Sequence, residues 1–209
     1  MRILVSVLCG YERHGWLSPE LVQVLLGFQR ERQEVAISLN ADTMPVERAR
    51  NFSAQQALEF RADWLLMLDN DVQPPANVLR VLDGAGPAHD VICLSYWGVI
   101  DGLPAVHIVG ENGRFEPKSG FQEIKRGGTG AIFIRRRVLE KMPKPHFSMR
   151  LSKDGLQLLK GEDFDFCDRA RELGFRIWTH GAFPVEHSHQ FQLGYLAEHL
   201  RLKEPYDPS

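Results

Sequence analysis

Two aspartates at the end of an apolar run are the first feature of the sequence that suggests chemistry. The run LLMLDNDVQPP covers residues 65–75, and its apolar part ends at Asp69 and Asp71. Burying two negative charges together is costly unless a cation joins them, and hard divalent cations prefer carboxylate oxygens. Such a triplet can also start a turn through its own side-chain hydrogen bonds. Both interpretations are open for the triplet alone, and its place after a buried strand favours the ligand.

A second acidic group occurs in GEDFDFCDRARELG, residues 161–174, which has the spacing of an amphipathic helix. Glu162 and Asp163 project from its first turn on or beside the apolar side, where the positive helix end favours carboxylates. That position also directs them toward any opening of the core, so a structural and a functional role are both open. Three other acids fall on the polar side, where we expect solvated charges: Asp165, Asp168 and Glu172.

Two histidines lie near the end of the chain in VEHSHQ, at His187 and His189. A single histidine is more often structural than a metal ligand, and two near an acidic turn shift that balance toward even. Alternate residues of a regular strand face the same side, but a bend in the segment would break this alternation. We therefore expect at most one of the two histidines to bind metal.

Basic and amide side chains occupy the first turns of the helix expected in PVERARNFSAQQAL, at Arg48, Arg50 and Asn51. Basic residues fit poorly with the positive end of a helix, and a nearby anion would repair the mismatch. Surface pairing with Glu47 or Glu59 explains the same residues equally well, so this segment alone does not decide between the two.

The elements that must position these residues alternate along the first hundred residues. Apolar β-rich runs predict strands at residues 2–9, 34–40, 63–69 and 90–97, and amphipathic segments predict helices at 18–32, 45–62 and 74–86. This alternation predicts a parallel sheet covered by helices, with ligands at the carboxyl ends of its strands. Beyond about residue 98, short β-like pieces predict hairpins or a mixed edge, and residues 147–163 read as an irregular loop with no clean period.

Length and composition place the chain among ordinary globular proteins. It has 209 residues, enough for one sizeable domain, and a net charge of −2, which gives no basic field for nucleic acid or anionic membrane. Three scattered cysteines (Cys9, Cys93 and Cys167) predict buried thiols in a reducing compartment. No run approaches the roughly 20 residues of a membrane span, and the N-terminal run is too short for a signal peptide, so we expect a cytoplasmic protein.

Several segments in this order resemble the GT-A fold of nucleotide-sugar glycosyltransferases, nearest to the inverting glycosyltransferase family 2. They are ARN before a helix, LLMLDNDVQPP as the DxD motif, GGTGAIFIRR as the small-residue loop and strand, GEDFDFCDRARELGFRIW as the ED-motif helix, and VEH as the late histidine. The resemblance implies a Rossmann-like α/β domain over residues 1–209, with a mostly parallel sheet flanked by helices and a small mixed β/loop acceptor side. Its parts would be a nucleotide-binding half (1–98), an acceptor and catalytic half (99–190) and a C-terminal tail (191–209).

The resemblance also implies a role for each acidic site residue. Asp71 would ligate Mn²⁺ or Mg²⁺ on the donor diphosphate, Asp69 would assist through the ribose or a metal-bound water, and His187 would complete the metal site. Asp163 would be the general base that takes the proton of the acceptor hydroxyl, and Glu162 would orient that base or the acceptor.

The donor itself would meet a further set of residues under the same resemblance. Arg50 and Asn51 would lie near the nucleotide, and the loop at residues 38–42, with Asp42, would approach the base. The donor-sugar pocket would be shaped by Gly128, Thr129 and Gly130.

The function implied is a metal-dependent hexosyltransferase that moves a sugar, with inversion, from a nucleoside-diphosphate sugar such as a UDP-sugar to a hydroxyl. The acceptor could be a glycan, a lipid-linked sugar, a protein, a small molecule or a modified DNA base, and nothing indicates the oligomeric state. One alternative is a nucleotidyltransferase or phosphohydrolase, which would need a second acidic metal site or a Gly-rich phosphate loop that CGYERHGW (9–16) does not supply. Another is a non-catalytic nucleotide-sugar-binding domain, which would have no use for an inward Asp163.

Overall fold

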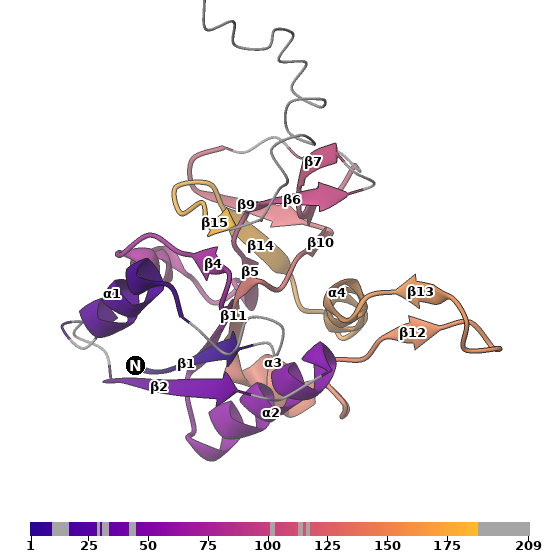
Figure 1. Cartoon of the computed structure of the whole chain (residues 1–209), viewed down its shortest axis with the longest axis horizontal. Coiled ribbons are helices and arrows are strands. Elements are labelled where there is room, and N and C mark those ends of the chain that lie inside the picture. Colours follow the sequence, from indigo (N-terminus) through magenta and orange to yellow (C-terminus); the bar gives the residue numbers. More distant parts are fainter. Residues whose placement is uncertain are drawn as a thin grey trace, which may run out of the picture.

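A seven-stranded sheet forms the centre of the molecule (Figure 1), seen in a computed structural model of the whole chain. The structure describes residues 1–9, 17–28, 30, 34–41, 45–100, 103–112, 115 and 118–187. The strand order is β2-β1-β3-β11-β5-β14-β9. In chain order the strands are β1 (Arg2–Cys9), β2 (Glu34–Ala41), β3 (Trp64–Asp69), β5 (Val91–Cys93), β9 (Phe121–Ile124), β11 (Ala131–Arg135) and β14 (Ile177–His180).

The sheet is mainly parallel, as predicted. β1 runs parallel to β2 and β3, and β14 runs parallel to β5, whereas β11 is antiparallel to β3 and β5, and β9 is antiparallel to β14. Strands from before and after residue 98 are interleaved in this one sheet. The division of the chain into two functional halves stays a prediction.

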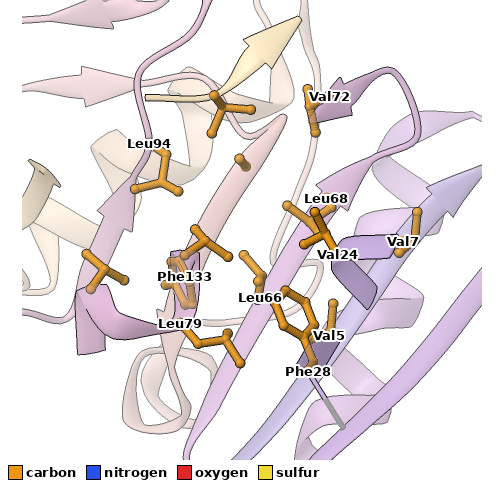
Figure 2. Close-up of a cluster of buried hydrophobic side chains, with 14 of the residues drawn as sticks. Val5, Val7, Val24, Phe28, Leu66, Leu68, Val72, Leu79, Leu94 and Phe133 are labelled. Atoms are coloured by element: carbon orange, nitrogen blue, oxygen red, sulfur yellow. The ribbon is translucent and has the colours of Figure 1, made fainter. Parts of the chain in front are cut away.

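Helices cover both faces of the sheet and bury its apolar side chains. On one face α1 (Pro19–Phe28) and the 3₁₀ helix η2 (Val78–Gly84) pack on the sheet, and Figure 2 shows Val24 and Phe28 of α1 beside Val5 and Leu66 of the sheet. The other face is covered by α2 (Val46–Glu59), α3 (Arg136–Lys141) and α4 (Glu162–Glu172). Sheet residues of alternating direction supply both clusters, which is the pattern of a strand buried on two sides.

Short strand pairs make up the mixed β region that was expected beside the sheet. They are β4 (Val72–Gln73) with β15 (Glu186–His187), β6 (Trp97–Ile100) with β7 (Leu103–Val106), β8 (Ile108–Val109) with β10 (Arg126–Gly127), and β12 (Arg150–Leu151) with β13 (Leu158–Lys160). Each of these strands has only two to four residues, and an isolated pair of such strands is not stable alone, so its position depends on the body of the domain.

Two predicted elements differ from those observed. The third helix is the 3₁₀ segment η2, whose four apolar residues all pack inward within seven positions. The segment predicted as an irregular loop contains the hairpin β12–β13, because strands of two and three residues are too short to give a detectable period.

Cys9, Cys93 and Cys167 are buried and free, as predicted, and the reducing compartment stays a prediction. In the part of the chain that the structure describes, no helix has the length and apolar character needed to cross a bilayer.

Candidate active site

The aspartate turn lies at the carboxyl edge of the sheet, next to the small-residue loop that precedes β11. Backbone hydrogen bonds fix this arrangement: the Asp69 amide donates to the Gly130 carbonyl at 2.8 Å, and the Asn70 amide donates to the Leu8 carbonyl at 3.1 Å. The antiparallel pairing of β3 with β11 continues this contact from Leu68 opposite Ala131. The predicted position of the aspartates at the carboxyl end of a buried strand is confirmed, and ligand binding at this edge stays a prediction.

Asp71 and His187 lie side by side although they are far apart in sequence. β4 follows the aspartate turn and pairs with β15, which places Val72 opposite His187. His187 Nε2 is 3.3 Å from Asp71 Oδ2, and its Nδ1 is 3.2 Å from the Trp97 carbonyl oxygen. The hydrogen bond with Asp71 raises the pKa of His187 above its ordinary value, against the opposing effect of burial.

Arg50 joins the two acidic motifs. Its guanidinium donates from Nη2 to Asp69 Oδ2 at 3.2 Å, from Nε to Glu162 Oε1 at 3.2 Å, and from Nη1 to the Thr129 carbonyl at 3.0 Å. The side chain is only 4% exposed. Burial favours loss of the charge, but the carboxylates of Asp69 and Glu162 outweigh it and raise the pKa of Arg50. The anion predicted near this arginine is therefore at least in part the protein's own pair of carboxylates.

Asp163 stands in the first turn of α4, beside Glu162. Its Oδ1 accepts a hydrogen bond from the Phe164 amide at 2.7 Å. Burial, followed by the charge of Glu162, raises the pKa of the Asp163 carboxyl. A carboxylate whose proton affinity is raised in this way is better suited to accept a proton than an exposed one.

Tyr96 is a residue of this site that the sequence analysis did not single out. Its Oη accepts a hydrogen bond from the Gly130 amide at 3.3 Å, and a Cβ at Gly128 would lie 2.1 Å from that oxygen. Its ring stacks on His107 at 5.2 Å and meets His187 edge-on at 5.1 Å. Burial raises the pKa of Tyr96. Gly128 and Gly130 thus make room for an aromatic ring. The sequence signals this ring only by a tyrosine just after an apolar run.

The residues fit a divalent metal ion only in part. Among the described residues, no three His, Cys, Asp or Glu side chains are grouped so that they could hold a metal. Asp71 and His187 nevertheless offer adjacent oxygen and nitrogen ligands, and Asp69 Oδ1 is buried without a hydrogen-bond partner in the described structure. Carboxylate oxygens suit both Mn²⁺ and Mg²⁺, which commonly take further ligands from phosphate and water, whereas the imidazole nitrogen suits Mn²⁺ better than Mg²⁺.

The residues predicted to meet the nucleotide and the sugar differ in their contacts. Asn51 uses its side-chain amide to hold backbone, donating to the carbonyls of Glu47 and Phe147 at 2.7 Å each and accepting from the Phe147 amide at 3.1 Å. Thr129 is buried, and its Oγ1 has no hydrogen-bond partner among the described residues. Asp42 and His189 lie outside the described residues. A nucleotide role for Asn51 and Arg50 and a sugar role for the 128–130 loop stay predictions.

Asp165 is a correction to the sequence analysis, because it is fully buried rather than solvated. Ser148 Oγ donates to its Oδ2 at 3.0 Å, and it forms ion pairs with Arg150 and Arg169. Asp168 is also largely covered, and Arg126 and Lys160 pair with it. A helical wheel cannot reveal this burial, since the partners other than Arg169 lie outside α4, at Ser148, in the hairpin β12–β13 and in β10.

Comparison with known proteins relates this geometry to solved structures. No model of a known protein family matches the sequence, and no curated protein matches it. The chain resembles A197 from STIV, with 22% sequence identity and a TM-score of 0.65, over 91% of this chain and 87% of that chain. It also resembles GalNAc-T7, crystallised with UDP, GalNAc and Mn²⁺, with 12% identity and a TM-score of 0.54, over 92% of this chain and 44% of that one. The chain therefore has the GT-A fold that the sequence predicted.

Proposed function

We propose that this chain is a metal-dependent inverting glycosyltransferase of the hexosyltransferase type. It would transfer a sugar from a nucleoside-diphosphate sugar, preferably a UDP-sugar, to an acceptor hydroxyl. The observation that carries this proposal is the position of Arg50, whose single guanidinium binds both Asp69 at the strand end and Glu162 of the ED pair. Two acidic motifs with separate tasks in this chemistry therefore meet at one site. The fold of GalNAc-T7, crystallised with UDP, GalNAc and Mn²⁺, supports the choice of donor and ion.

On the acceptor side, Asp163 accepts the proton of the attacking hydroxyl. Its raised pKa suits this role, and a positioned general base contributes roughly 10²–10⁴-fold to the rate. Glu162 is held by Arg50, so its negative charge stays beside Asp163 and contributes to that raised pKa. The hydroxyl attacks the anomeric carbon opposite the leaving diphosphate, which inverts the configuration there.

On the donor side, Asp71 and His187 would hold Mn²⁺ or Mg²⁺, with Asp69 close by. The bound ion supplies positive charge that stabilises the leaving diphosphate. Arg50 holds Asp69 through Oδ2 and leaves Oδ1 directed elsewhere without a hydrogen-bond partner among the described residues. Tyr96 packs edge-on against His187 and so restricts the orientation of the imidazole.

The proposal is tested by thermal shift with a panel of UDP-, GDP-, ADP- and dTDP-sugars, each with and without Mn²⁺. Stabilisation follows ligand affinity by mass action, so one nucleotide class should raise the melting temperature only when Mn²⁺ is present. Asp71→Asn should abolish that shift. Glu172→Gln, which changes an exposed acid of α4, should leave it intact.

Two outcomes would contradict the proposal. One is the absence of any Mn²⁺-dependent shift across the panel. The other is an unchanged shift in the Asp71→Asn variant, because this would remove the acidic turn from donor binding.

A further inference from the structure

The hairpin β12–β13 projects from the body of the domain beside α4 (Figure 1). Its strands and turn carry four exposed leucines: Leu151 (53% exposed), Leu156 (84%), Leu158 (58%) and Leu159 (64%). Large contiguous apolar patches are uncommon on the surfaces of soluble proteins and mark sites of interaction. The hairpin is therefore a candidate surface for a partner.

Within the described part of the chain, leucines remain exposed on both faces of the hairpin. Leu158 and Leu159 are consecutive, and both remain more than half exposed, although neighbouring residues of a regular strand alternate between two faces. Leu151 pairs with Leu158 across the hairpin, and Leu156 lies in the turn. A partner that removes these side chains from water must surround the tip rather than press against one face.

The base of the hairpin, in contrast, is fixed to the protein. Arg150 pairs with the buried Asp165, and Lys160 Nζ lies 2.6 Å from Asp168 Oδ2. Both contacts are made to α4, which carries Asp163 in its first turn. The basic residues at the base are thus neutralised by the protein itself, and the base of the hairpin is held against α4.

A groove of about 1050 Å³ adjoins the hairpin, and its lining includes Met149 and Leu151. Phe52 and the basic residues Arg48 and Lys144 line the same groove. Lys153 adds a further exposed positive charge near the hairpin turn.

Two carboxylates oppose these three cations. Glu47, also in the groove lining, is partly buried, and Asp154 accepts hydrogen bonds from the Ser152 hydroxyl and the Leu156 amide within the turn. The surface therefore combines exposed leucines with a modest excess of positive charge.

We propose that the hairpin β12–β13 and the adjoining groove dock onto an anionic lipid bilayer, with the leucines entering its apolar part. Fluid lipid can surround a protruding tip from every side. The hairpin spans only residues 150–160, and a stable protein interface uses about 20–30 residues a side. Arg48, Lys144 and Lys153 would meet the anionic headgroups, as basic residues do at membrane surfaces.

Cosedimentation of the full chain with sucrose-loaded vesicles tests this without any substrate, so its outcome is independent of the proposed function. We expect binding to vesicles of phosphatidylcholine with phosphatidylserine and weaker binding to phosphatidylcholine alone. The Leu156→Asp, Leu159→Asp double variant should lower the partition coefficient roughly tenfold or more, since Asp is strongly disfavoured in the apolar part of a bilayer. Leu26→Asp is the matched control, because Leu26 on α1 is 57% exposed and should not contribute. Melting temperatures verify that all variants fold.

Lys144→Glu combined with Lys153→Glu should remove the preference for anionic vesicles. The proposal is overturned if the wild-type chain binds neither vesicle, or if the leucine double variant binds as well as the Leu26→Asp control. It is also overturned if light scattering shows a dimer that the leucine double variant dissociates while vesicles do not bind, since a second copy would then cover the hairpin.

Discussion

The helix α4 carries two pairs of acidic residues that are only a few positions apart and have opposite environments. Asp165 and Asp168 are neutralised by basic side chains, chiefly Arg150, Arg169, Arg126 and Lys160. Glu162 shares Arg50 with Asp69, and Asp163 forms no salt bridge among the described residues, although the nearby charge of Arg50 partly offsets the rise of its pKa. Burial raises the pKa of Asp163. Burial also opposes ionisation of Asp168, but its contacts with Arg126 and Lys160 outweigh burial and lower the pKa of Asp168.

The difference shows that the partner of a carboxylate, rather than its place on a helix, decides what it can do. Asp165 and Asp168 hold the hairpin β12–β13 against α4, and their negative charges are already paired with basic side chains. Glu162 and Asp163 border the carboxyl edge of the sheet, where a substrate could reach them. Substitutions that neutralise one member of each pair should therefore separate activity from stability.

The largest expected effect is on the rate, from Asp163→Asn. The amide cannot accept the proton of the acceptor hydroxyl, so kcat should fall by roughly 10²–10⁴-fold while donor binding survives. Release of nucleoside diphosphate in the presence of acceptor measures the rate, and thermal shift with the donor measures binding. Glu172→Gln on the exposed side of α4 is the control and should retain the rate. Full activity of the Asp163→Asn variant would remove the distinction between the two acid pairs.

The second effect is on stability, from Asp165→Asn. Asp165 has no exposed surface, so the change leaves Arg150 and Arg169 without their negative partner. Removing one partner of a fully buried ion pair costs about 3–5 kcal/mol, and we expect about 2 kcal/mol because Arg150 is 51% exposed. Calorimetry should show a melting temperature lower by about 4–8 °C, with the rate per folded molecule retained. A clear loss of rate per folded molecule would instead place Asp165 in the catalytic machinery.

Most of the fold followed from the sequence because its signals are local. The continuous apolar runs at 2–9 and 63–69 are strands buried on two faces, and the aspartates that end the second run lie at the sheet edge as expected. The inward position of Glu162 and Asp163 also followed from helical geometry alone. These features depend on the period of one segment, which a single sequence reveals.

What local periodicity could not predict depends on contacts between distant segments. The family resemblance, and not the period of any segment, brought His187 to Asp71, because the two-residue strands β4 and β15 that join them are too short to recognise. Asp165 pairs with Arg150 of the hairpin, and Tyr96 occupies the space left by the glycines of a later loop. Arg50 was expected near an anion, but which carboxylates it binds depends on how α2, β3 and α4 meet.

A smaller effect on the rate is expected from Gly161→Ala, just before α4. A Cβ at this position would lie 2.9 Å from Asp163 Oδ1, and Gly161 has φ −68°, which alanine adopts freely. The Asp163 carboxylate can turn aside without moving the backbone, so the chain should fold normally while the base is displaced. Since a small misplacement of a reacting group is costly, we expect kcat to fall roughly tenfold with little change in melting temperature.

Gly27→Ala in α1 is the matched control for this change, because no heavy atom lies within 4 Å of the added Cβ. It should leave the rate unchanged and slightly stabilise the helix, where alanine is favoured over glycine. Equal rates in both variants would mean that the position of the Asp163 carboxylate does not matter for turnover.

The smallest effect is the change in stability of the Asp163→Asn variant with pH. The pKa of Asp163 is raised in the folded chain, so the folded state holds this proton more tightly than the unfolded state. Stability is therefore lost as pH rises from the unfolded pKa through the folded pKa, and it stays lower above that window. An amide does not titrate, so Asp163→Asn should be slightly more stable than wild type at neutral pH, with the advantage vanishing in acid. The positive end of α4 opposes this trend by favouring the ionised carboxylate. Melting temperatures of both proteins from acidic to neutral pH measure which effect is larger, burial or the positive helix end. A wild type that is more stable than Asp163→Asn at neutral pH would mean that the helix end outweighs burial at Asp163.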